Sequence, residues 1–249
     1  MAEPKTKRRL DQLLVELGLA ETRSQAQSLI MAGLVFKGEV RLDKAGTLLA
    51  PDTEVSVKGR EHPWVSRGGL KLTHALDAFA LDPDGMVCLD VGASTGGFTD
   101  VLLTAGASKV YAVDVGHGQF AWKLRNDPRV VLLERTNARN LTATQIPELI
   151  DVIVCDASFI GLATILPASL ARAAPGAYLV ALIKPQFEVG KGRVGKGGVV
   201  RDPLLHDEVC AKIRAWIDSL PGWQVLDIVE SPITGPRGNK EFLIAASHS

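Results

Sequence analysis

Apolar residues in the first part of the chain follow a helical spacing and then a strand-like one. Residues 8–17 place Leu10, Leu13, Leu14 and Leu17 on one face of a helix, which Gly18 is expected to end. A second helix is expected after Thr22, a suitable N-cap residue, with Gly33 closing it. Short β-rich pieces follow at 34–36, 39–42 and 54–58. This pattern predicts a small α+β domain that ends near Gly59.

The rest of the chain alternates between short apolar runs and helical patterns. The apolar runs are 87–91, 109–115, 130–133, 151–155 and 178–183. Continuous runs of this length are typical of strands buried on both faces of a parallel sheet. Helices are expected after the candidate cap Ser66, from Phe98 and over 203–219, and strands 224–229 and 241–246 are expected to form an antiparallel pair. The sequence therefore predicts an α/β, Rossmann-like domain with a mostly parallel sheet and an antiparallel terminal strand.

The turn after the first of these runs has the arrangement of a ligand-binding turn. Strand, glycine-rich turn and helix follow one another over 87–99, which presents backbone N–H groups and a helix N-terminus to a ligand. The spacing is Gly-Ala-Ser-Thr-Gly-Gly, so Ser94 stands where a dinucleotide-binding turn needs its second glycine. Asp90 precedes the turn and would repel a pyrophosphate, but it suits the cationic amino-acid end of S-adenosylmethionine. Asp114, about 20 residues on, is placed to bind ribose hydroxyls.

Polar residues also follow the later apolar runs. Asn137, after 130–133, is a candidate to hydrogen-bond an adenine edge, while Asp156 and Lys184 end 151–155 and 178–183. Open α/β sheets bind ligands at these strand ends. The expected cofactor contacts are therefore Asp90, Gly92, Ala93, Ser94, Thr95, Gly96, Gly97, Phe98, Asp114, Asn137 and Asp156. The alternative is an ordinary turn with two solvated carboxylates.

Composition and charge limit the remaining classes of protein. The chain has 249 residues, 46% of them hydrophobic and 22% charged, with no apolar run near the roughly 20 residues that span a bilayer. The basic N-terminus has no apolar segment behind it, so we expect no secretory signal and a cytoplasmic location. Cys88 and Cys155 fall inside apolar runs, which predicts buried thiols in a reducing compartment. Since the net charge is zero, an RNA partner must be argued from local patches.

Two local basic patches support an RNA partner. Residues 8–35 resemble the small RNA-binding domain named after a small-subunit ribosomal protein, the S-four type, although Lys37-Gly38 replaces that family's usual Asn-Gly. The resemblance implies that Arg8, Arg9, Arg23 and Ser24 hold an RNA backbone, as arginine forks and helix N-termini hold phosphate. A solvated arginine face is the alternative. The second patch, Lys191, Arg193 and Lys196, lies in a glycine-rich stretch, 190–200, expected to be a mobile loop over the site.

A wider resemblance covers nearly the whole chain, from about Lys7 to Ala245. It rests on the motifs at 66–71, 90–99, 111–116, 134–137, 155–160, 183–187 and 238–241, which resemble the TlyA family. Members of that family, first called haemolysins, are FtsJ-like rRNA 2′-O-methyltransferases. The resemblance implies S-adenosylmethionine-dependent methylation of a cytidine ribose in bacterial rRNA, with ribosomal subunits as partners and neither membrane nor metal involved.

The same resemblance implies particular residue roles. A catalytic tetrad maps onto Lys71, Asp156, Lys184 and Glu241, and Arg67 is assigned to RNA. The implied domains are an RNA-binding domain (1–59), a linker (60–65) and a methyltransferase domain (66–249). A ribose hydroxyl is a weak nucleophile that must lose its proton as it attacks a methyl group, and Lys184 is the best-placed residue to assist. Whether Lys184 acts as a general base or as a fixed charge beside the developing alkoxide stays open.

Competing classes each lack a feature or leave one unexplained. A pore-forming cytolysin, as the family's old name suggests, needs an amphipathic hairpin or an apolar span, and the sequence shows neither. A nicotinamide dehydrogenase needs the missing G-x-G-x-x-G. A non-catalytic RNA-binding factor need not keep Lys71, Asp156, Lys184 and Glu241 together. A methyltransferase for proteins or small molecules would not explain an arginine-bearing N-terminal domain.

Overall fold

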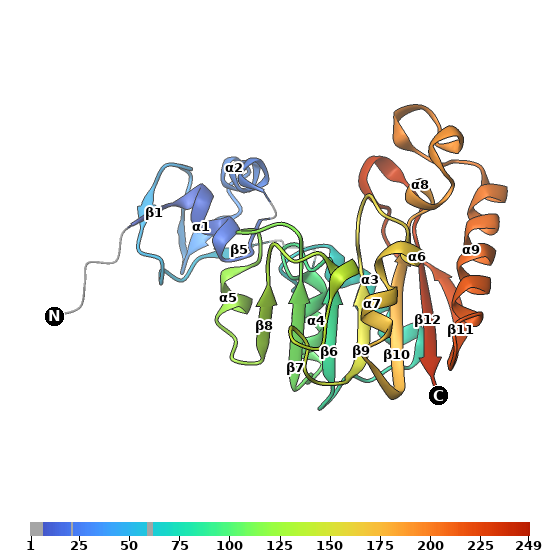
Figure 1. Ribbon diagram of the computed structural model, residues 1–249. Coiled ribbons are helices and arrows are strands. Elements are labelled where there is room, and N and C mark those ends of the chain that lie inside the picture. The colour runs from blue at the N-terminus through green and yellow to red at the C-terminus, as the bar shows by residue number, and fades with distance from the viewer. Residues whose placement is uncertain (1–6, 21, 59–61) are drawn as a thin grey trace.

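The computed structural model describes residues 7–20, 22–58 and 62–249 as a small domain beside a large α/β domain (Figure 1). The small domain lies at the β8 (Val130–Leu133) and α5 (Trp122–Arg125) edge of the large sheet (Figure 1). The first residues of the expected RNA-binding domain and the start of the expected linker, 60–61, lie outside the described residues.

The small domain contains two helices and two small sheets. Its elements are β1 (Arg8–Arg9), α1 (Leu10–Glu16), α2 (Arg23–Met31), β2 (Val35–Lys37), β3 (Val40–Arg41), β4 (Leu48–Leu49) and β5 (Ser56–Val57). The predicted cap of the second helix is confirmed, because Thr22 Oγ1 accepts the N–H of Gln25 at 3.1 Å. The predicted start of the first helix is wrong: Arg8 and Arg9 pair with β4 as a strand, and the helix begins at Leu10. Of the four leucines expected on one face, those at positions 10, 13 and 14 are buried, and Leu17 is partly buried against the same core.

The large domain is built on a seven-stranded sheet in the order β11-β12-β10-β9-β6-β7-β8. Besides β8, its strands are β6 (Val87–Val91), β7 (Lys109–Val113), β9 (Ile150–Cys155), β10 (Ala173–Ile183), β11 (Trp223–Glu230) and β12 (Phe242–His248). Its helices besides α5 are α3 (Gly68–Phe79), α4 (Gly97–Thr104), α6 (Leu162–Ile165), α7 (Pro167–Leu170), α8 (Pro185–Glu188) and α9 (Pro203–Asp218). Among the described strands of this sheet, β12 pairs antiparallel with both of its neighbours, β10 and β11, whereas all the other pairs are parallel. The predicted fold class and terminal antiparallel pair are confirmed.

Each face of this sheet is covered by helices. Side chains of α3, α4 and α5 form one core with strand residues such as Cys88 and Val154, and side chains of α6, α7 and α9 form the other with Leu89 and Ile153. Neighbouring strand residues thus enter opposite cores, as a strand buried on both faces requires. Burying each of these leucine or isoleucine side chains contributes roughly 1.5–3 kcal/mol. Cys88 and Cys155 are buried as predicted, and burial raises the pKa of each thiol to about 12.

The strand order places a crevice at one point of the sheet edge. The chain runs from β6 outward to β7 and β8, and then returns to the other side of β6 as β9. Loops that leave β6 and β9 therefore diverge, which is the position where open α/β sheets bind ligands. The start of α3 lies beside this point, but not as expected: the helix begins at Gly68, and Ser66 accepts the Gly69 N–H through its carbonyl rather than its side chain.

Candidate functional site

A cavity of about 340 Å³ opens at the carboxyl ends of β6 and β9. Thr22 of the small domain contributes to its wall, as do Ile233 to Gly235 near the end of the chain. Many of the residues predicted to bind cofactor or to act in catalysis come together around it: Lys71, Asp90, Gly92, Ala93, Ser94, Thr95, Gly97, Phe98, Asp156 and Lys184, with Arg67 at the rim. Segments far apart in sequence therefore meet at the predicted crevice.

Asp90 lies at the floor of this cavity with its side chain fully buried. Its Oδ2 accepts the backbone N–H of Thr99 at 3.0 Å and the Thr99 hydroxyl at 2.7 Å, while Oδ1 is buried with no hydrogen-bond partner. Burial raises the pKa of Asp90 to about 7, and the nearby charges of Asp156 and Asp114 add to this, although the bonds from Thr99 oppose it. An unpaired buried carboxylate oxygen facing a cavity suits a cationic ligand, which would satisfy it.

The glycine-rich turn is held by the second predicted carboxylate. Asp114 accepts the Ser94 N–H through Oδ2 at 2.8 Å and the Gly116 N–H through Oδ1 at 2.6 Å. Ser94 has a left-handed backbone, with φ of +50°. Gly96 has φ of +95°, and a Cβ there would lie 2.5 Å from Leu124 Cδ1. The left-handed backbone and the close approach of Leu124 of α5 therefore both favour glycine at position 96.

One predicted cofactor residue, Asn137, is not placed as expected, and an exposed apolar residue, Val115, was not included in the prediction. Asn137 is not among the described residues that line the cavity; its Oδ1 accepts the Arg139 N–H at 3.1 Å and caps a short 3₁₀ helix, Ala138–Asn140. Val115 follows Asp114 and is 70% exposed, although it is a large apolar side chain. The sequence reasoning missed Val115, and the signal was an apolar residue directly after a strand-ending acid.

The four residues of the expected tetrad form one continuous chain of contacts. Glu241 Oε2 lies 2.7 Å from Lys71 Nζ, and Lys71 Nζ lies 3.4 Å from Asp156 Oδ2. Asp156 Oδ1 lies in turn 2.5 Å from Lys184 Nζ. The side chain of Glu241 is fully buried, and those of Lys71 and Lys184 are 9% and 7% exposed. The strand tips of β9 and β10, the helix α3 and the start of β12 bring these charges together.

The two lysines differ in their surroundings. Burial alone would lower the pKa of Lys71, but the carboxylates of Asp156 and Glu241 outweigh it and raise that pKa above its usual value. Lys71 therefore stays a cation at neutral pH. Lys184 Nζ also donates to Ser158 Oγ at 3.0 Å and to the Asp156 carbonyl at 3.3 Å, so acceptors surround it on the protein side. Ser158 is a neighbour of Lys184 that sequence reasoning did not select.

A second cavity, of about 330 Å³, lies on the other side of Lys184 and Glu241. Its lining includes Gln186 and an aromatic pair, Phe159 and Phe187, whose ring centroids are 5.2 Å apart. Phe159 is 89% exposed and has φ of +67°, a strained backbone for a bulky residue. An open aromatic surface next to the tetrad is suited to a planar ring of a substrate.

The basic stretch 190–200 borders this second cavity through Val194 and Gly198. It forms two short 3₁₀ helices, and the buried side chain of Asn239 holds it by accepting the Val200 N–H at 3.1 Å and donating to the Gly198 carbonyl at 3.0 Å. Arg193 pairs with Glu208 of α9, whereas Lys196 is exposed. The stretch therefore lies beside the cavity next to Lys184 and Glu241, its predicted role as a mobile loop over the site stays a prediction, and the side chain of Lys191 lies outside the described set.

The arginines of the small domain are organised by a buried acid. Asp11 is fully buried and accepts from Arg9 Nε at 3.0 Å, Arg23 Nε at 2.8 Å and Gln27 Nε2 at 2.9 Å. The bond from Arg9, with those from Gln27 and Arg23, holds the pKa of Asp11 well below its usual value although burial opposes this. Arg8 instead pairs with Glu16 at 3.4 Å.

Ser24 is exposed in the first turn of α2, beside Arg23. The predicted RNA-binding residues of the small domain therefore lie near one another at its surface. Sequence reasoning missed Asp11, whose signal was an acid placed on the otherwise apolar face of the first helix.

Comparison with known proteins bears on both domains. Residues 64–248 match the FtsJ-like methyltransferase family, and residues 8–55 match the S4 domain. Over 237 residues the chain is 51% identical to the Mycobacterium tuberculosis protein TlyA, covering 95% of this chain and 88% of that one. The chain belongs to the TlyA family of FtsJ-like methyltransferases.

Two further relatives of this TlyA-family chain agree with that assignment. The Bacillus subtilis protein YqxC, named as an rRNA methyltransferase, is 48% identical over 96% of this chain and 85% of its own length. The solved structure of a Streptococcus thermophilus protein named as a hemolysin has a TM-score of 0.74 and 43% identity, covering 99% of this chain and 90% of that one. Within the described ranges, no helix is both long and apolar enough to cross a membrane.

Proposed function

We propose that this protein transfers a methyl group from S-adenosylmethionine to the ribose 2′-hydroxyl of a cytidine in bacterial rRNA. The observation that carries the proposal is the buried chain of contacts from Glu241 through Lys71 and Asp156 to Lys184, next to a cavity suited to a cationic cofactor. The M. tuberculosis relative is named a 16S/23S rRNA (cytidine-2′-O)-methyltransferase, and 51% identity over most of the chain supports the same reaction here.

The residues around the first cavity fit S-adenosylmethionine. The unpaired Oδ1 of Asp90 matches the ammonium of its amino-acid end, and the turn from Gly92 to Thr95 offers backbone around it. Asp114, which holds Ser94, is placed for ribose hydroxyls, and the exposed Val115 beside it for the apolar face of adenine. When bound, the cofactor supplies an electrophilic methyl group on a sulfonium. The predicted hydrogen bond of Asn137 to an adenine edge stays a prediction, because its side-chain oxygen caps a 3₁₀ helix.

The residues of the tetrad have different roles toward the ribose hydroxyl. Lys71 remains a cation, fixed between Glu241 and Asp156, and it keeps the Asp156 carboxylate oriented toward Lys184. Lys184 holds the attacking oxygen and, with Nζ in its neutral form, accepts the proton of the hydroxyl there. Loss of a positioned proton acceptor costs about 10²–10⁴ in rate. The roles of all four residues stay part of this proposal.

RNA is held by sites on both domains in this proposal. Arg9 and Arg23, oriented by Asp11, with Arg8 and Ser24 bind phosphates at the small domain. Arg67 at the cavity rim and Lys191, Arg193 and Lys196 of the loop form the second set. The division into 1–59, 60–65 and 66–249 likewise remains a prediction.

Methyl transfer from labelled S-adenosylmethionine to bacterial ribosomal subunits tests the proposal. The wild-type protein should label rRNA, and Lys184→Ala should label it at least about 100-fold more slowly at equal cofactor and RNA occupancy. A liposome-leakage assay run in parallel addresses the cytolysin alternative. Leakage at protein concentrations that give no rRNA labelling would contradict the proposed function.

A further inference from the structure

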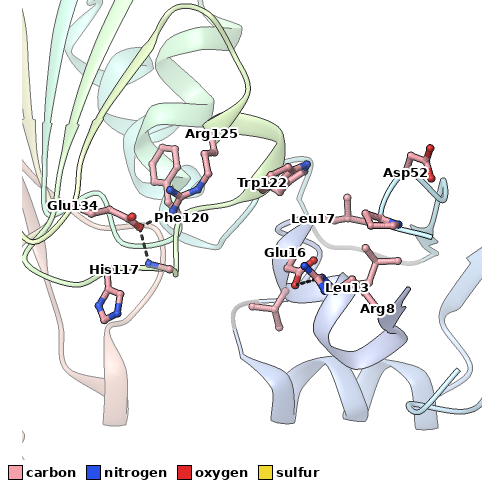
Figure 2. A pocket seen from close by; sticks show the side chains of 13 residues that line it. Arg8, Leu13, Glu16, Leu17, Asp52, His117, Phe120, Trp122, Arg125 and Glu134 are labelled. Carbon is pink, nitrogen blue, oxygen red and sulfur yellow. Dashed lines mark hydrogen bonds and ion pairs between the residues drawn. The ribbon is translucent and has the colours of Figure 1, made fainter. Parts of the chain in front are cut away.

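A cleft of about 760 Å³ separates the two domains and is distinct from both cavities beside the tetrad (Figure 2). One wall is α1 of the small domain with the loop at Pro51 and Asp52. The other wall is the segment from His117 to Arg125 with Glu134. Nothing in the proposed methyl transfer uses this cleft.

Close packing fixes the two walls relative to each other. A Cβ at Gly18, which has φ of +67°, would lie 2.7 Å from Ala121 Cβ and 2.9 Å from Val65 Cγ1. The backbone N–H of Val65 in turn donates to Asp100 Oδ2 at 2.8 Å. The small domain therefore packs directly against Ala121, the residue that precedes α5. This packing holds the two walls of the cleft in place.

Trp122 is a large apolar residue of this cleft whose exposure the packing of the fold does not explain. Its neighbours Ala121 and Leu124 are 0% and 4% exposed, whereas Trp122 is 50% exposed. Figure 2 shows its side chain reaching from the methyltransferase domain toward Leu17 on the opposite wall. A tryptophan left half in solvent offers a flat apolar ring to a ligand.

The charges in the cleft favour a neutral ligand. Arg8 pairs with Glu16 at 3.4 Å, and Arg125 Nη2 lies 2.7 Å from Glu134 Oε1, which also accepts the Gly118 N–H at 2.7 Å. Beside these ion pairs the cleft is lined by apolar side chains, of which Leu13 and Phe120 are themselves buried: Leu13, Val15, Leu17, Pro51, Phe120 and Trp122. The apolar side chains and the flat ring of Trp122 suit a nucleobase, which needs a stacking surface with polar groups at its edge.

The cleft is continuous with the arginine-bearing face of the small domain. Arg8, Val15 and Glu16 line both the cleft and a neighbouring groove that includes Gln12 and Arg23. An RNA strand whose phosphates lie at Arg23 can therefore pass a base into the cleft. We propose that this interdomain cleft binds an unpaired nucleobase of the substrate RNA, stacked on Trp122, away from the nucleotide that is methylated. The inference rests on the proposed RNA substrate.

Equilibrium binding of an rRNA fragment across a range of salt concentrations tests the cleft. Trp122→Ala should weaken binding about 5- to 150-fold, the usual effect of losing one stacking side chain, with an unchanged salt slope because no phosphate contact is lost. Trp122→Phe should retain most of the affinity. The matched control is Leu204→Ala, a 74%-exposed apolar residue on α9, which should bind as the wild type.

A stacking-specific readout distinguishes this role from a structural one. RNA should quench tryptophan fluorescence in the wild type, and Trp122→Phe should lose that component while still binding RNA. Single-turnover methyl transfer at saturating RNA should be unchanged in Trp122→Ala. Equal RNA affinity of wild type and Trp122→Ala would overturn the proposal, as would a dimer that only Trp122→Ala disrupts. Neither result alters methyl transfer by the wild type, so the proposed function is judged separately.

Discussion

We expect Asp90→Asn to stabilise the cofactor-free protein above pH 7 and to weaken its affinity for S-adenosylmethionine. Asparagine keeps the shape of the side chain and one oxygen that can accept both hydrogen bonds from Thr99. It removes the carboxylate whose burial raises the pKa of Asp90 from 3.8 to about 7. Because Asp90 is fully buried, its ionisation opposes folding, and the same negative charge is what a cationic cofactor requires.

The size and the pH range of the stability effect follow from that pKa. Protonated Asp90 favours the folded state, so its contribution is fully present below pH 3.8 and is lost as the pH rises through about 7. At about 1.36 kcal/mol per pKa unit, the full loss is roughly 4 kcal/mol, an upper value. Urea unfolding at a series of pH values measures it. The free energy of unfolding of the wild type should fall relative to Asp90→Asn between pH 5 and 8.

Calorimetric titration with S-adenosylmethionine measures the other half of the prediction. A hydrogen bond to a charged group contributes about 1.5–3 kcal/mol, so Asp90→Asn should bind roughly 10- to 150-fold more weakly at pH 8. Wild-type affinity should rise with pH up to about 7, since the cation binds the ionised carboxylate, and the variant should lose this dependence. The reasoning is refuted if Asp90→Asn binds the cofactor as tightly as the wild type, or if it is the less stable protein at pH 8.

Three further predictions concern the tetrad and the small domain. Lys184→Ala and Lys184→Arg should both slow single-turnover methyl transfer about 10²–10⁴-fold with nearly unchanged cofactor and RNA binding, and a near wild-type rate for Lys184→Arg would exclude the general-base role. Glu241→Gln should lower the free energy of unfolding in urea by up to about 3–5 kcal/mol, because Lys71 loses the nearer of its two carboxylate partners, at 2.7 Å, and keeps only Asp156 at 3.4 Å; unchanged stability would show that the Glu241–Lys71 pair is not coupled. Asp11→Asn should weaken RNA binding and reduce the salt slope by about one, because a single amide oxygen cannot hold both Arg9 and Arg23. The control variant at an exposed site, Asp43→Asn, should change neither quantity, and equal salt slopes for the two variants would mean that these arginines do not contact phosphate.

The large sheet could be predicted from the sequence because its strands are local apolar runs. Each run between 87 and 183 became a parallel strand, with ends shifted by a few residues. The strand at Arg8–Arg9 could not be predicted in this way, because it exists only through pairing with Leu48–Leu49, which is distant in sequence. The prediction that the Ser66 side chain caps α3 was wrong, because the Gly69 N–H donates to the backbone carbonyl of Ser66.

The site was predictable in its residues more than in its contacts. Strand-ending positions and the family motifs indicated Asp156 and Lys184, but the 2.7 Å contact of Glu241 with Lys71 depends on β12 inserting antiparallel beside β10. Asp90 was expected at the ligand, and its full burial against Thr99 depends on how α4 packs under the turn. Trp122 could not be selected from the sequence, because the cleft that it lines exists only where residues of the two domains come together.

Identification of the atom that receives the methyl group tests the proposed reaction most directly. Bacterial rRNA labelled by this protein and S-adenosylmethionine can be hydrolysed in alkali, which cleaves RNA only where a free 2′-hydroxyl remains. Label should appear in alkali-resistant dinucleotides that contain 2′-O-methylcytidine, and it should accumulate at least about 100-fold more slowly with Lys184→Ala. Label on a nucleobase would instead be released in mononucleotides, because alkali cleaves the backbone on both sides of that nucleotide. This result would contradict ribose methylation at the Lys71–Asp156–Lys184–Glu241 site.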